Sequence, residues 1–288
     1  MQYLQYVVFG LVTGTILLLG TVGFSMIRRV DNFLNIAHGQ MVALGGFFGY
    51  TFYQELNLPF VLASLAAMVA TGLLGWISYK LIFSPIRDHG PLYLLFTSVG
   101  VAFVIHGAIE MIWGTTPKTF RLPQLFTVRI GEEYLASGLE VIIIATAFAA
   151  VGLLHLLLTR TRTGIAIRAM SSEFNLARVR GVNTEAVSGV VWIIGSALAG
   201  LAGILTGAQG AVFSDMGWVI ILVILSASVL GGLGSIYGVM IGAVLIGIGM
   251  DFSVNLINPA YRYAFAFVVI MLVLAVRPQG IFGGGRSE

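Results

Sequence analysis

The sequence comprises 288 residues, of which 58% are hydrophobic and 9% are charged, and its net charge is +3. Soluble domains hold about 45–50% apolar and about 25% charged residues, so this composition excludes a soluble fold and indicates a surface that mostly faces hydrocarbon. The absence of cysteine excludes disulfides, thiolate metal sites and cysteine nucleophiles. Because the basic residues lie between apolar runs, they indicate membrane topology rather than nucleic-acid binding.

The chain contains nine apolar segments that are long enough to cross a bilayer as helices, which takes about 20 residues each. Helices are expected because only hydrogen bonds within a segment satisfy its backbone in lipid. The predicted spans are residues 5–27, 34–54, 59–83, 92–113, 134–158, 187–207, 217–232, 236–256 and 260–276. They predict an all-α, polytopic helix bundle of about nine spans, within a range of roughly eight to ten. We expect a single transmembrane domain over residues 1–282 and a flexible tail at 283–288.

The densest group of arginines lies in the loop 159–186, between the fifth and sixth spans. The excess of Lys and Arg in cytoplasmic loops of membrane proteins places this loop in the cytoplasm. Counting spans from it puts the N-terminus outside and the C-terminus in the cytoplasm. The basic residues of the predicted outer loop 114–133 are the one departure from this rule.

Glycine occurs 37 times, in part as pairs four residues apart within spans, such as Gly45/Gly49 and Gly203/Gly207. Pairs of this kind let helix backbones approach closely inside a membrane. We therefore expect a tightly packed bundle.

The cytoplasmic loop is expected to hold one short helix of about two turns. Ser171 or Ser172 is the expected N-cap, and Gly181 is the expected residue after the C-cap. Glu173 at the expected start of this helix and Arg178 and Arg180 at its end carry charges that complement the helix dipole. Its apolar residues have no lipid to cover them, which indicates a docking element for a cytoplasmic partner. The positive-inside rule alone would explain the arginines but not the caps. The residues assigned to docking are Ser171, Ser172, Glu173, Phe174, Leu176, Ala177, Arg178, Arg180 and Gly181.

Polar residues also mark the start of the second span, where Asn35, His38, Gly39 and Gln40 follow one another closely. Polar groups at a membrane entry are costly unless they face protein or water. They therefore predict either part of a substrate pathway, built on a broken helix entry, or a hydrogen-bonded cluster between helices.

Ionisable residues occur within the predicted spans. His106 and Glu110 are four residues apart on one face of the fourth span, and Asp251 lies in the eighth. Intramembrane carboxylates are functional candidates by default, and Glu110 or Asp251 could meet a substrate ammonium group from outside. The alternative is that both are hydrated and structural.

Other motifs are missing. The sequence has no Gly-x-x-x-x-Gly-Lys-Ser/Thr phosphate-binding loop, and its four histidines are too scattered to specify a metal site. No nucleophile–base pair is evident, so we expect no enzymatic activity in this chain.

Short motifs follow one another along almost the whole sequence. They are Asn35-Ile-Ala-His38-Gly39, Pro85-Ile-Arg87, Ile112-Trp113-Gly114, Pro117-Lys118-Thr119-Phe120, Arg160-Thr-Arg-Thr-Gly164, Arg168-Ala169, Gly181-Val-Asn183, the run 229–235, and Pro278-Gln-Gly280-Ile281. In this order they resemble the permease subunits of branched-chain amino-acid ABC importers, the LivH-like family. The family's usual Asn-Phe-Ala-His-Gly reads Asn-Ile-Ala-His-Gly here.

The resemblance implies a multi-subunit importer in the plasma (inner) membrane of a prokaryote. A second permease subunit, identical or homologous, would complete the pathway, and an extracytoplasmic binding protein would deliver substrate. Two cytoplasmic ATP-binding subunits would carry ATP and Mg, while this chain binds no cofactor. The segment 171–181 would be the coupling helix seated on an ATPase. Relatives also transport urea or short-chain amides, so the likeness does not choose the substrate.

An ion-coupled secondary transporter, driven through His106, Glu110 or Asp251, is the alternative function. Whether uptake requires ATP and partner ATPases separates the two hypotheses.

Overall fold

The computed structural model describes residues 2–123, 125–130, 133–256, 258–277 and 279–282, so the tail predicted at 283–288 lies outside the described residues. The α-helices are α1 Gln2–Asp31, α2 Ala37–Tyr50, α3 Phe60–Ser78, α4 Ser84–Ile86, α5 Pro91–Trp113, α6 Gly138–Arg160, α7 Arg162–Ser172, α8 Phe174–Val179, α9 Thr184–Gln209, α10 Met216–Gly231, α11 Ile236–Leu256 and α12 Arg262–Val276. The shorter elements are π-helical turns at Thr51–Glu55 and Tyr79–Phe83, 3-10 turns at Arg87–His89 and Pro259–Tyr261, and strands β1 Lys118–Thr119, β2 Thr127–Ile130, β3 Glu133–Ser137 and β4 Ala211–Val212.

The predicted all-α membrane bundle is confirmed. Within the described residues, seven helical stretches are long and apolar enough to cross a membrane: Gln5–Asp31, Phe60–His89, Pro91–Trp113, Gly138–Arg160, Thr184–Gln209, Ile236–Val254 and Pro259–Val276. The other two predicted spans are shorter. Helix α10 is an apolar helix of 16 residues, and the 14 residues of α2 continue into a π-helical turn. The protein is a multi-pass membrane protein.

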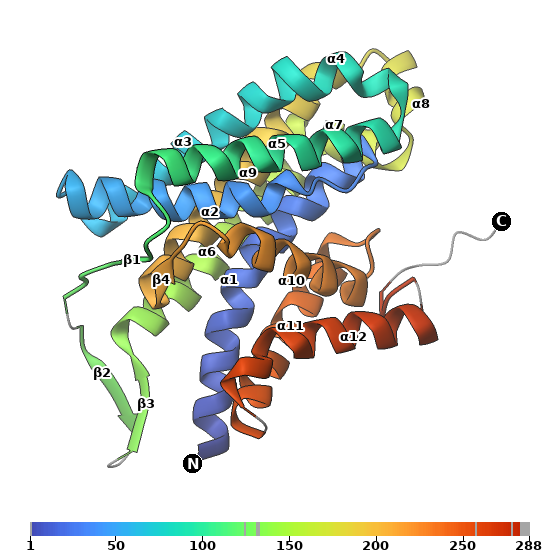
Figure 1. Ribbon diagram of the computed structural model, residues 1–288. Coiled ribbons are helices and arrows are strands. Elements are labelled where there is room, and N and C mark those ends of the chain that lie inside the picture. The colour runs from blue at the N-terminus through green and yellow to red at the C-terminus, as the bar shows by residue number, and fades with distance from the viewer. Residues whose placement is uncertain (1, 124, 131–132, 257, 278, 283–288) are drawn as a thin grey trace.

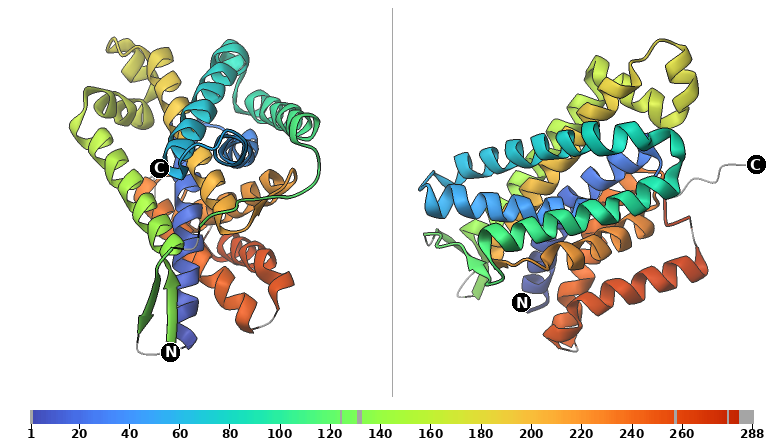
Figure 2. Two further views of the ribbon diagram at one scale, coloured as in Figure 1. Left: turned by 90° about the vertical axis from the view of Figure 1, so that its left-hand side faces the viewer. Right: turned by 45° about the horizontal axis from the view of Figure 1, so that its top comes forward.

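The helices run between two ends of the molecule (Figure 1). At one end, which we call the arginine end, Arg28 of α1 donates to the carbonyl of Leu233 after α10 (3.5 Å), and Arg87 after α4 pairs with Asp31. At the other, the hairpin end, the Trp113 indole of α5 donates to the Thr51 hydroxyl (2.8 Å), and β1 pairs with β4. Figure 2 shows α7 and α8 at the periphery of the arginine end, away from the β2–β3 hairpin.

Two of the helix boundaries that differ from the prediction have a local cause. The fifth span begins at Gly138 rather than 134, because the residues before it form β3, which pairs antiparallel with β2. Ser137 and Glu140 then close a capping box, with the Glu140 amide donating to the Ser137 hydroxyl (3.2 Å) and the Ser137 amide to the Glu140 carboxylate (2.7 Å). The second span begins at Ala37, since Asn32 has a φ of 55° and ends the preceding helix.

Helices α2 and α9 pack through their backbones, as the glycine pairs predict. A Cβ added at Gly45 would collide with the Cα of Gly200, and one at Gly203 would collide with the carbonyl oxygen of Val42. In lipid the hydrophobic effect does not drive helices together, so van der Waals contact between closely approaching backbones stabilises their association instead. Helix α1 packs most extensively against α11 and α9, so α1, α2, α9 and α11 form the centre of the bundle.

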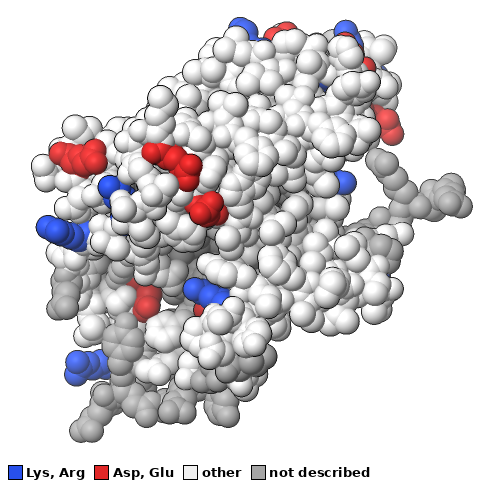
Figure 3. Space-filling model, viewed as in Figure 1, with Lys and Arg blue, Asp and Glu red and all other residues white. Residues whose placement is uncertain are grey.

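Charged side chains are unevenly distributed over the surface in Figure 3. They gather along the upper edge and on the left-hand side, and a wide uncharged area lies between them. Large apolar side chains are exposed along α3, α5 and α12, including Val69, Val104 and Met271. An apolar surface of this extent suits contact with lipid tails.

Alanine at Gly45 should destabilise the bundle, whereas alanine at Gly100 of α5 should not. Overpacking costs about 1–3 kcal/mol in a well-packed core, and at Gly45 the backbone of α9 would have to move. Gly100 has open space where a Cβ would lie, so alanine there gains helix propensity of up to about 1 kcal/mol. Thermal unfolding in detergent compares the two variants, and equal melting temperatures would contradict the packing described.

Candidate functional site

The loop 159–186, expected to hold one short helix, holds two, α7 and α8. Ser171 and Ser172 end α7, so they are not N-caps, and the Ser171 hydroxyl donates to the carbonyl of Ile167 (2.8 Å). The reason is that α7 begins earlier than the predicted helix. The Thr161 hydroxyl caps α7 by accepting from the Gly164 amide (3.0 Å), so that the two serines fall in the last turn of α7. Glu173 takes the N-cap position of α8 without a side-chain cap hydrogen bond.

The C-terminal end of α8 lies where the sequence placed it. Gly181 has a φ of 84°, its amide donates to the Arg178 carbonyl (3.1 Å), and the Val182 amide donates to the Ala177 carbonyl (3.1 Å). This is a Schellman motif, in which glycine supplies the left-handed residue. Arg178 lies in the last turn of α8, and Arg180 is its C-cap.

The apolar residues of α8 point in two directions. Leu176 and Val179 are 54% and 84% exposed, whereas Ala177 is buried. Phe174 is half-buried, and its ring lies 4.2 Å from the guanidinium carbon of Arg87. The expectation of one continuous free face is therefore wrong: Phe174 and Ala177 face the bundle, and Leu176 and Val179 remain on the surface.

Arg87 joins α8 to a buried carboxylate, which the sequence reasoning missed. Its Nη2 lies 2.6 Å from Oδ1 of Asp31, and its Nη1 donates to the Ser188 hydroxyl (3.1 Å). The other oxygen of Asp31 accepts from the Trp192 indole (2.6 Å), and Ser188 donates to Oδ1 (3.1 Å). These four groups and Phe174 form what we call the Asp31 node. It links α1, the turn after α4, α8 and α9.

The polar residues at the entry to α2 are buried in the bundle. His38 Nε2 lies 2.8 Å from the carbonyl oxygen of Gly20, and Gly39 lies against the backbone of Gly217. The side-chain amide atoms of Asn35 and Gln40 are buried and have no hydrogen-bond partner among the described residues. Buried polar groups without partners are rare. These two amides can bind water or a polar ligand.

His106 and Glu110 form the pair expected from their spacing, with 3.6 Å between His106 Nε2 and Glu110 Oε1. The same nitrogen lies 3.7 Å from Oδ1 of Asp215, in the loop before α10, and Nδ1 lies 3.3 Å from the Ser214 carbonyl oxygen. Asp215 was missed because it lies outside the spans. Within the described residues, no group of three or more His, Cys, Asp or Glu side chains is arranged to hold a metal ion.

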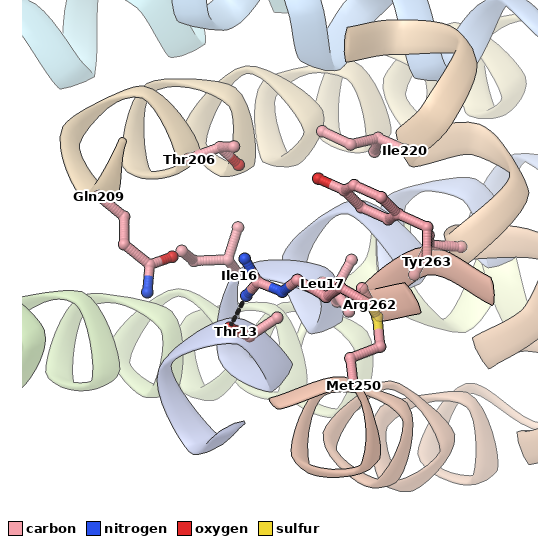
Figure 4. Close-up of a pocket in the computed structure, with 10 residues that line it drawn as sticks. Thr13, Ile16, Leu17, Thr206, Gln209, Ile220, Met250, Arg262 and Tyr263 are labelled. Carbon is pink, nitrogen blue, oxygen red and sulfur yellow. Dashed lines mark hydrogen bonds between the residues drawn. The ribbon is translucent and has the colours of Figure 1, made fainter. Parts of the chain in front are cut away.

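Asp251 is paired within the chain in this structure. Its Oδ1 lies 2.9 Å from Nη2 of Arg262, and its Oδ2 accepts from the Thr13 hydroxyl (2.6 Å). Arg262 also donates to Thr13 (2.7 Å) beside a cavity of about 80 Å³ (Figure 4). Asp251 is thus not a free counterion for an incoming ammonium group. An arginine at the start of the ninth span was the sequence signal for this pairing.

The predicted site residues occupy four separate places. The docking segment lies at the arginine end, His106 contacts the loop before α10, and Asp251 contacts α1 and the start of α12. Asn35, His38, Gly39 and Gln40 lie in the core where α2 meets α1 and α10. The structure does not gather them into one catalytic centre.

Comparisons with known proteins agree on one family. The family described as branched-chain amino acid transport system / permease component matches residues 6–274. The high-affinity branched-chain amino acid transport system permease protein BraD of Pseudomonas aeruginosa is 29% identical, over 100% of this chain and 98% of its own length. LivH of Salmonella typhimurium is 26% identical with the same coverage. PsaBC from Streptococcus pneumoniae, solved with a Fab, shares the fold, with a TM-score of 0.52, 13% identity, and coverage of 98% of this chain and 94% of that one.

Replacing Arg87 by Gln should destabilise the protein more than replacing Arg87 and Asp31 together by Gln and Asn. The single change leaves a buried carboxylate unpaired, which costs about 3–5 kcal/mol. The double change removes that charge. Unfolding of the wild type, both single variants and the double variant in detergent measures the coupling. Strictly additive effects would show that the pair does not act as a unit.

Proposed function

This chain belongs to the family of permease components of branched-chain amino acid transport systems, and from that premise we propose that it forms the translocation pathway of an ABC importer for branched-chain amino acids. ATP is hydrolysed on two cytoplasmic partner subunits, and binding there shifts the bundle between outward-facing and inward-facing states. A second permease subunit and an extracytoplasmic binding protein complete the importer.

The exposed apolar pair on α8 carries the coupling part of this proposal. Leu176 and Val179 lie on a short helix that ends in a Schellman motif at the arginine end, outside the membrane-spanning helices. The basic loop 159–186 favours a cytoplasmic location for that end, with the N-terminus outside. A partner that covers Leu176 and Val179 can push on α8, and Phe174 passes the displacement to Arg87 and the Asp31 node.

Replacing Leu176 or Val179 by Asp should weaken association with the ATPase subunits at least about tenfold. A carboxylate buried at an interface without a partner costs more than the roughly 1.4 kcal/mol that corresponds to tenfold. Co-purification from membranes that contain the whole importer measures the association.

The matched control is Leu56→Asp, because Leu56 is 60% exposed at the hairpin end. It should leave ATPase association unchanged. Equal loss for Leu56→Asp and Leu176→Asp, or no loss for either α8 variant, would contradict docking at α8.

The energy source separates this proposal from an ion-coupled transporter. Uptake of leucine into proteoliposomes should require the ATPase subunits, internal ATP and the binding protein, and should persist when ion gradients are collapsed. Uptake by this chain alone along an ion gradient would establish the alternative. Uptake of urea or short-chain amides in place of leucine would keep the importer but change its substrate.

A further inference from the structure

The cavity of about 80 Å³ lies where α1, the end of α9, α10, α11 and the start of α12 meet (Figure 4). A cavity needs at least about 10–15 Å³ to hold one water molecule, so this one has room for several water-sized groups. It can therefore take in part of a small organic ligand. Several of its lining side chains are apolar, among them Ile16, Leu17, Ile220 and Met250.

Arg262 provides the charge among these apolar side chains. Its Nη2 is used by Asp251 and Thr13, whereas its Nε is buried and has no partner among the described residues. The side chain is 32% exposed, so a ligand in the cavity can reach it. A guanidinium presents five N–H donors in a planar fork that matches a carboxylate. Arg262 can therefore donate hydrogen bonds to a further carboxylate while it keeps its contact with Asp251.

Neutral polar groups complete the lining. Figure 4 shows the Tyr263 hydroxyl and the Gln209 amide at the cavity, on either side of the Arg262 guanidinium. A hydroxyl can donate to a carboxylate, and an amide oxygen can accept from an ammonium group. The cavity is thus lined by a cation, by neutral hydrogen-bonding groups and by apolar side chains.

We propose that this cavity holds an aliphatic α-amino acid during its passage, with the α-carboxylate on Arg262 and the side chain against Ile16, Leu17 and Ile220. This inference rests on the proposed function and specifies where the substrate is held. Asp251 is then a positioning residue, because together with Thr13 it fixes the guanidinium at the cavity.

Substrate size provides the first test. Ile220→Phe fills part of the cavity, so ATP-driven uptake of leucine by the complete importer should fall about tenfold relative to uptake of alanine, the lower end of what a methylene-sized change gives in an apolar pocket. Leu222→Phe is the matched control, because Leu222 lies on the same helix, is 45% exposed and does not line the cavity. It should leave the leucine-to-alanine ratio unchanged.

The α-carboxylate of the transported amino acid provides the second test. In the wild type, leucinamide, which lacks the α-carboxylate, should compete at least about tenfold more weakly than leucine for uptake. Arg262→Gln should reduce that preference below the wild-type value, because the selection left is that of the binding protein, and Arg262→Lys, which keeps the charge without the fork, should reduce it less. If the ion pair between Arg262 and Asp251 only joined α11 to α12, replacing Arg262 would change the amount of folded protein. It would not change how strongly leucine competes relative to leucinamide.

The outcomes distinguish the two levels of inference. If the wild-type importer shows no ATP-driven uptake of amino acids, the proposed function fails. If it transports leucine but Ile220→Phe leaves the leucine-to-alanine ratio unchanged and Arg262→Gln retains the wild-type preference for leucine, the cavity does not hold the substrate and the proposed function stands.

Discussion

The carboxylate of Asp31 is the charge around which the arginine end of the bundle is assembled. A buried charge is tolerated only when it is paired and hydrogen-bonded, and Asp31 draws its partners from two segments distant in sequence: Arg87 after α4, and Ser188 and Trp192 of α9. Because Arg87 also lies against Phe174, α8 is held to the same node. Through these contacts α8 is connected to both α1 and α9.

Much of the fold could be predicted from the sequence because lipid restricts the choices. Length and backbone hydrogen bonding make each apolar run a helix. The errors fell on short segments outside this constraint. Residues 134–137 suit a strand as well as a helix, and at 171–173 the start of α7 at Thr161, rather than any property of the serines, decides where the next helix begins.

The candidate sites were only partly predictable, because their geometry is tertiary. An acidic residue in an apolar run is visible in sequence, so Glu110 and Asp251 could be singled out. Arg262 was a visible signal for one partner of Asp251. The other partners could not be predicted, since Thr13 and Asp251 are 238 positions apart and Asp215 lies in a loop. The same limit applies to α8, where spacing gave an apolar face but not the contact that turns Phe174 inward.

The glycine contacts between α2 and α9 also have a mechanical consequence. Where helices touch through backbone atoms, no layer of side chains lies between them to re-pack. Helices α2 and α9 are therefore expected to move together as one rigid unit. Helix α5 is different, since Gly100 and Gly107 have open space around them and much of its surface is uncovered. Opening and closing of the bundle would then be a tilt or slide of outer helices about a rigid axis, the hinge and shear motions by which packed proteins change shape.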